Sequence, residues 1–213
     1  MENAPTGSGR FCIYLIKEDV MAMVKLNHNF NLFIDPKYYA DILLKNDEAG
    51  SVLKLQLIAE RFLEVYLDER IPTHSRKFFE RGRKGELLKY FDEKLMVAVA
   101  FGLPVELADA LKKLNKVRND FGHDFDRALS ALDLDAYIQS VELFNIDVGQ
   151  PFAGSGPIRT TIVKSDQKTL RASDSFVTGF VIATFCLMTR AGLWLVNDLN
   201  SRGQLKTEPA LHL

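Results

Sequence analysis

Cysteine is scarce in this chain, which holds only Cys12 and Cys186 among its 213 residues. Two cysteines build no disulfide framework and there is no Cys-x-x-Cys pair, so neither a structural zinc site nor a thioredoxin-type redox centre is predicted. An excess of one charge is also absent, because 27 Lys and Arg residues stand against 28 Asp and Glu residues. Any binding of nucleic acid or acidic lipid must therefore come from a local patch. We expect no cofactor and no metal.

The chain also lacks an export signal and an uninterrupted membrane span. Residues 1–9 have neither the basic start nor the apolar middle of a signal peptide and are expected to be a disordered tail. The longest apolar stretch, 176–196, contains Arg190, which would be costly near the centre of a bilayer. We therefore expect a buried core helix there, no membrane partner and a cytoplasmic location.

What the chain does have is a globular composition with helical periodicity. Hydrophobic residues make up 47% and charged residues 26%, which suits one domain with its own core. Apolar residues recur at three- and four-residue steps, as on one face of a helix. The predicted helices are 36–45, 51–70, 86–101, 104–121, 133–144 and 166–198, with a further helical segment at 17–26.

These elements predict an all-α bundle around three long helices. Residues 11–16 form either a strand or the lead into a helix, and 158–163 are expected to form a short edge strand. We predict an N-terminal extension over residues 1–50, a helical domain over 51–200 and a C-terminal tail over 201–213.

One segment, Asn-Lys-Val-Arg-Asn-Asp-Phe-Gly-His-Asp at 115–124, carries the chemistry. Arg118 falls on the predicted apolar stripe one turn after Leu114, where a charge is costly unless it is paired or opens onto a site. A helix break at Gly122 would let His123 swing back toward the guanidinium. An arginine binds phosphate oxygens through its guanidinium, and an imidazole exchanges a proton near neutral pH. The pair therefore suits RNA cleavage without a metal ion.

A purely structural interpretation remains open for the same residues. Arg118 would then form a buried ion pair with Glu60, Glu64 or Glu93. His123 would be a cation near the negative end of the helix dipole. The spacing of an arginine and a histidine does not by itself decide between these interpretations.

The pattern Arg118-Asn119-x-x-x-His123 resembles the RNxxxH motif of the HEPN superfamily of all-α domains. The wider stretch 91–124 is similar to the mannitol operon repressor (MltR) branch, with a helix that ends at a Gly-Leu turn, a second helix and then "LNxVRNxFGH". The similarity covers about residues 51–198. The fold it implies is a HEPN-like helical bundle with a small N-terminal extension.

The resemblance also implies an activity and partners. Such domains commonly form homodimers that place two RNxxxH motifs across a shared cleft. Many are metal-independent endoribonucleases of toxin–antitoxin, antiphage or RNA-processing systems, whereas others are non-catalytic regulators that act through protein contacts. If the roles of the family's residues apply to this chain, Arg118 and His123 are the catalytic pair and Asn119 supports them. Glu60 or Glu64 is then the acidic residue that faces the motif. RNA and a cognate antitoxin or regulatory protein are the expected partners.

Two departures limit what the resemblance implies. In a subgroup of these proteins a tyrosine two residues after the histidine accepts a nucleotide, but Phe125 stands there and has no hydroxyl. That form of control is not expected. The sequence also shows no helix-turn-helix that would make it a DNA-binding repressor by itself.

A second candidate lies at 75–84, where cations alternate with two aromatic residues in a pattern that suits phosphate contact and base stacking. The candidate nucleic-acid-binding residues are Arg76, Lys77, Arg81, Arg83 and Lys84. The alternative is a solvated connection whose Phe78 and Phe79 pack into the core, since Glu80 dilutes the patch.

Overall fold

The computed structural model describes residues 14–17, 20–25, 31–43, 47–79, 88–124, 126–145, 161–163, 169–204 and 206–209. Most of these residues are helical, which confirms the all-α class. The helices are α1 (Asn31–Ile34), α2 (Pro36–Leu43), α3 (Glu48–Arg70), the 3-10 helix η1 (Thr73–Phe78), α4 (Phe91–Ala100), α5 (Val105–His123), α6 (Ala131–Leu143) and α7 (Phe176–Ser201). The strands are β1 (Tyr14–Lys17), β2 (Val20–Lys25), β3 (Thr161–Val163), β4 (Thr169–Arg171) and β5 (Lys206–Pro209).

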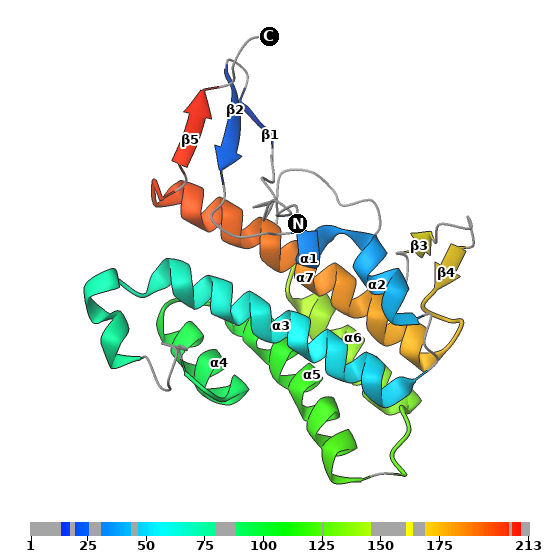
Figure 1. Cartoon of the computed structure of the whole chain (residues 1–213). Helices are drawn as coiled ribbons and strands as arrows, with labels where there is room; N and C mark the ends of the chain where they lie inside the picture. Colours follow the sequence, from blue (N-terminus) through cyan, green and yellow to red (C-terminus); the bar gives the residue numbers. More distant parts are fainter. Residues whose placement is uncertain are drawn as a thin grey trace, which may run out of the picture.

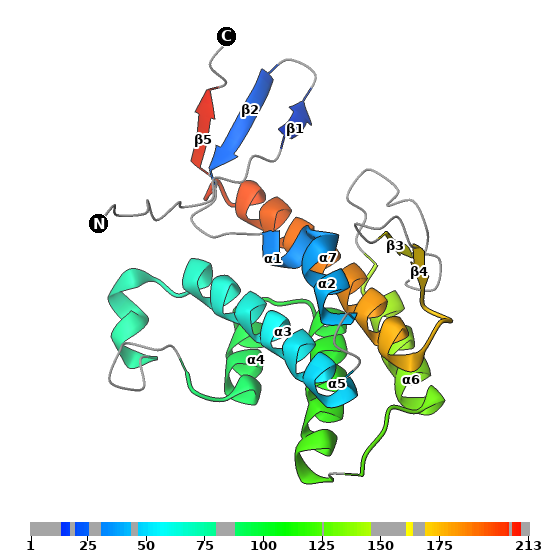
Figure 2. The same cartoon turned by 45° about the vertical axis from the view of Figure 1, so that its right-hand side comes forward.

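Helix α7 is the central element of the bundle. It packs against α1, α2, α3 and α6, and α5 packs against α3, α4 and α6 (Figures 1 and 2). By length and composition alone α7 could cross a membrane, but 72% of its most apolar window is buried inside the protein. The predicted core helix is therefore confirmed, although it starts at Phe176 rather than 166. Ser175 explains the start, because its Oγ accepts a hydrogen bond from Thr178 N at 3.1 Å.

The contact between α6 and α7 combines ring stacking with buried hydrogen bonds. The rings of Tyr137 and Phe180 stack with their centroids 5.1 Å apart, and the Tyr137 hydroxyl lies 2.9 Å from Thr184 Oγ1. Arg190, the charge within the apolar stretch, donates from Nη1 to the carbonyl oxygens of Val141 at 3.1 Å and Phe144 at 3.4 Å. A cation at these last carbonyls satisfies acceptors that the end of α6 leaves free.

Part of the predicted N-terminal extension belongs to this same core. Phe33 and Tyr39 are fully buried, and Thr189 of α7 donates to Phe33 O at 3.3 Å. Helix α2 begins as the sequence predicts, since Asp35 Oδ1 accepts from Lys37 N at 2.9 Å just before the helix. Residues 31–43 therefore help to build the bundle.

The helix predicted at 17–26 is wrong. Residues 20–25 form β2, which is antiparallel to β1 with Tyr14 opposite Met23, and β5 lies on the other side of β2 in the order β1-β2-β5. A pairing partner some 180 residues away leaves no mark on the local pattern. Strand β1 confirms the strand alternative for residues 11–16. Strand β3 confirms the strand predicted within 158–163, and it pairs with β4, where the last helix was predicted to begin.

Candidate functional site

The motif lies at the end of α5, whose last turns extend beyond α3 and α4 (Figures 1 and 2). The predicted helix break at Gly122 does not occur. Helix α5 continues to His123, and Asp124 N still donates to Asp120 O at 3.1 Å. Arg118 and His123 are both exposed, and Asn119 is half-buried.

The unbroken helix fixes the angle between the two proposed catalytic side chains. At about 100° per residue, five residues place Arg118 and His123 about 140° apart around the helix axis. Asn119 lies between them, and its Oδ1 accepts a hydrogen bond from Arg118 Nη1 at 3.1 Å. A single chain therefore presents the guanidinium and the imidazole to solvent on two different sides of α5.

The buried ion pair considered for Arg118 is not formed. Arg118 continues the line of Leu111 and Leu114, which are fully buried, but it is itself exposed. Within the described ranges, the hydrogen bond to Asn119 is the one polar contact of its side chain. The guanidinium is consequently open to an anionic ligand.

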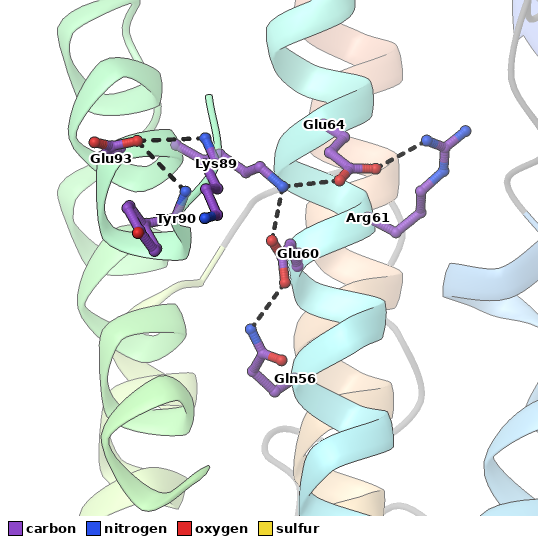
Figure 3. A network of polar contacts seen from close by, with 8 residues as sticks. Gln56, Glu60, Arg61, Glu64, Lys89, Tyr90 and Glu93 are labelled. Carbon is purple, nitrogen blue, oxygen red and sulfur yellow. Dashed lines mark hydrogen bonds and ion pairs between the residues drawn. The ribbon is translucent and has the colours of Figure 1, made fainter. Parts of the chain in front are cut away.

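Glu60 and Glu64, the predicted supporting acids, contact Lys94 of α4 rather than Arg118 (Figure 3). Lys94 Nζ lies 2.7 Å from Glu60 Oε1 and 2.8 Å from Glu64 Oε1, and Lys94 is only 5% exposed. Gln56 donates to Glu60 at 3.2 Å and Arg61 to Glu64 at 3.0 Å. We call Lys94 with Glu60 and Glu64 the Lys94 clamp, because it joins α3 to α4.

The electrostatics of the Lys94 clamp favour its charged state. Burial acts to raise the pKa of Glu64, but hydrogen bonds from Lys94 and Arg61 outweigh it, and the pKa lies below its ordinary value. Burial likewise acts to lower the pKa of Lys94, but the two glutamates outweigh it, and that pKa is raised. These shifts stabilise the ion pairs and indicate a structural role.

A polar groove of about 720 Å³ lies between α5, α6 and the first turn of α4. Its walls include Lys112, Lys113, Lys116, Asn119, Gln139 and Ser140. On α5 the steps from Lys112 to Lys116, Asn119 and His123 are four, three and four residues, so these four side chains share one side of the helix. The groove therefore joins Asn119 of the motif to a row of lysines. The groove exists because α6 packs beside α5, and nothing in the local sequence marks these lysines as part of its wall.

The basic segment at 75–84 is described only in part. Arg76 pairs with Asp68, and Lys77 Nζ lies 5.3 Å from the centroid of the Phe78 ring. Phe78 is exposed, whereas Phe79 packs edge-on against Phe101 at 6.1 Å between ring centroids. One of the two aromatic residues thus joins the core. The other candidate nucleic-acid-binding residues, Arg81, Arg83 and Lys84, lie outside the described residues.

The continuity of α5 can be tested at Gly122. A Cβ at Gly122 would meet no atom within 4 Å, so Gly122→Ala should raise the free energy of unfolding by about 0.5–1 kcal/mol and the Tm by about 1–4 °C. Gly102, with φ of +98°, is the matched control, and Gly102→Ala should destabilise by about 1–2 kcal/mol. Thermal unfolding followed by circular dichroism measures both. Destabilisation by Gly122→Ala would mean that the helix breaks there.

The described residues contain no cluster of three or more His, Cys, Asp or Glu side chains placed to hold a metal ion. Comparisons of the chain with protein-family models, with curated proteins and with solved structures found no match.

Proposed function

We propose that this protein is an RNA-directed, HEPN-type endoribonuclease that cuts without a metal ion, in a toxin–antitoxin, antiphage or RNA-processing system. The observation that supports this proposal most is the exposure of both Arg118 and His123 at the extended end of α5. A structural Arg118 would be held in a buried ion pair, which is not formed, whereas His123 in the last turn of α5 also lies where a cation suits the helix dipole. These two are free to meet a substrate.

A homodimer is part of the proposal because of the helix geometry. One α5 holds Arg118 and His123 about 140° apart, too far around the helix to act on one phosphate together. If the extended ends of two α5 helices meet across a twofold axis, Arg118 of one subunit lies opposite the partner subunit's His123. Each dimer then has two composite sites.

The proposed reaction is a transesterification of RNA. His123 accepts the proton of the 2′-hydroxyl, the 2′-oxygen attacks the adjacent phosphorus, and the bond to the 5′-oxygen breaks as that oxygen takes the proton from His123. The products are a 2′,3′-cyclic phosphate and a 5′-hydroxyl. Arg118 stabilises the negative charge on the phosphorane, and Asn119 orients the guanidinium through its hydrogen bond.

Cleavage of RNA in excess EDTA tests this proposal. The wild-type protein should produce 2′,3′-cyclic phosphate ends, and His123→Ala should lower the rate by at least about a hundredfold, because general acid–base catalysis is lost. His123 is exposed, so its replacement should leave the circular dichroism spectrum unchanged. The matched control is His74→Ala, which replaces a different exposed histidine, on η1 rather than α5. This variant should cut RNA at the wild-type rate. A wild-type protein that does not cut, or a His123→Ala variant that cuts as well, contradicts the proposal.

The second candidate is a non-catalytic, MltR-like regulator that acts through protein contacts. A groove of about 570 Å³ between α4 and α5 favours it, because Met96 is 68% and Val105 61% exposed there. A protein captured by the wild type and by His123→Ala, but not by Met96→Asp, would support this candidate. Cleavage that depends on His123 would support the nuclease.

A further inference from the structure

The polar groove beside α5 has the size and position of a substrate subsite. Its volume of about 720 Å³ falls in the range of small-molecule binding sites and accommodates a nucleotide. Asn119 lies in its wall, and His123 follows one turn later on the same side of α5. An RNA strand that reaches His123 can therefore continue along the groove toward Lys112.

The groove wall holds three lysines, Lys112, Lys113 and Lys116, against two carboxylates, Asp92 and Asp109. Lys116 is paired with Asp120 at 2.8 Å, and Asp92 accepts a hydrogen bond from Asn115 at 3.2 Å. Among the described residues, no ion pair or hydrogen bond engages the exposed side chains of Lys112 and Lys113. These two adjacent ammonium groups are available to phosphates, and the carboxylates of Asp92 and Asp109 oppose them in the groove wall.

The other wall supplies groups that suit an unpaired base. Gln139 is exposed on α6, and Asn119 faces the groove from α5, so an amide from each helix offers both a donor and an acceptor. Bases of single-stranded RNA present the hydrogen-bonding edges that a duplex conceals. The groove therefore offers lysines that can bind phosphates and amides that can bind a base, which are the two kinds of group that single-stranded RNA presents.

We infer that this groove binds the single-stranded RNA segment next to the bond that is cut, with Lys112 and Lys113 on its phosphates. The inference rests on the proposed function for the identity of the ligand as RNA. This site differs from the nucleic-acid-binding site considered at 75–84, because here the RNA lies on α5 and α6.

Binding is measured without cleavage in the His123→Ala protein, by the fluorescence anisotropy of a short labelled single-stranded RNA at several salt concentrations. Replacing Lys112 and Lys113 together by Ala should weaken binding. It should also reduce the slope of log K against log salt by about 1.4, at about 0.7 for each phosphate that the protein no longer neutralises. The matched control is Lys37→Ala, which removes an exposed lysine from α2, outside the groove, and should leave the slope unchanged.

Asp109→Asn provides a test in the opposite direction. The change removes one of the two opposing charges from the groove wall, so it should tighten RNA binding about threefold at low salt. A folding defect cannot produce tighter binding. Binding that is unchanged or weaker in this variant would count against an anion in the groove.

The outcomes separate the subsite from the nuclease. If the Lys112→Ala/Lys113→Ala protein binds with an unchanged slope, the subsite is overturned, while His123-dependent cutting would still support the nuclease. If the slope falls but the wild type does not cut, the groove stands as an RNA site and the nuclease proposal fails. A wild-type protein that binds no RNA overturns the subsite.

Discussion

Mixing two inactive variants, Arg118→Ala and His123→Ala, is expected to restore about a quarter of the wild-type rate of RNA cleavage. In a mixed dimer one composite site combines the intact Arg118 of one subunit with the partner subunit's His123, and the other site has neither. Random exchange makes about half of the dimers mixed, and each has one of its two sites intact. The expectation follows from the angle of about 140° between the two side chains on an unbroken α5.

The measurement uses co-expressed variants with different tags, so that the mixed dimer can be purified. This dimer has one intact site of two and should show about half of the wild-type rate, whereas each parent should be inactive. A mixture of Arg118→Ala with the Arg118→Ala/His123→Ala double variant is the control. It should stay inactive, since no site has both groups. If the purified mixed dimer of single variants is also inactive, a site composed across two subunits is excluded. Arg118 and His123 would then act within one chain or not at all.

Replacing Lys94 by Met is expected to lower the free energy of unfolding by about 3 kcal/mol and the Tm by about 6–12 °C. The variant leaves Glu60 and Glu64 without their shared cation in a partly buried position. Glu64 remains 37% exposed and hydrated, which places the loss at the low end of values for broken buried pairs. Denaturant unfolding at neutral pH measures it.

Two controls identify the cause of that loss. Lys89→Met removes an exposed lysine just before α4 and should change stability by less than about 0.5 kcal/mol. Combining Lys94→Met with Glu60→Gln and Glu64→Gln should recover much of the loss, because no uncompensated charge remains. If Lys94→Met is as stable as the wild type, the Lys94 clamp contributes nothing to the fold.

The Lys94 clamp also predicts a pH dependence. The lowered pKa of Glu64 means that its contribution is present above its ordinary value of 4.5 and is lost as pH falls through the lower folded-state pKa. The raised pKa of Lys94 means that its contribution is present below 10.5 and is lost as pH rises past the folded-state pKa. The stability difference between wild type and Lys94→Met should therefore be greatest between these limits and shrink toward both extremes.

Arg118 and Lys94 show how far the sequence can predict the site. A charge on an apolar stripe should be paired or open onto a site, and that rule singles out Arg118. The stripe has the right direction, but the bundle covers Val117 and leaves Arg118 exposed, and no local pattern marks where that cover ends. Lys94 is the residue to which the rule applies in full, since it lies between Phe91 and Leu95 on the buried side of α4.

The fold is predictable where local chemistry decides it. Asp35-Pro36 marks the start of α2, and the positive φ of Gly102 marks the turn between α4 and α5. Helical periodicity places α3, α5 and α6 to within a few residues. The polar groove and the three-stranded sheet could not be predicted, because each depends on segments that meet only after the chain has folded.

The pairing of β2 with β5 has a practical consequence for anyone who shortens this protein. A truncation after residue 204 keeps every described helix but removes one of the two neighbours of β2 and turns that side of β2 into an edge. The newly bare backbone amides and carbonyls would then be a template for another chain, and self-association through that edge would mimic a natural dimer in a sizing experiment. Studies of how subunits assemble should keep the last strand.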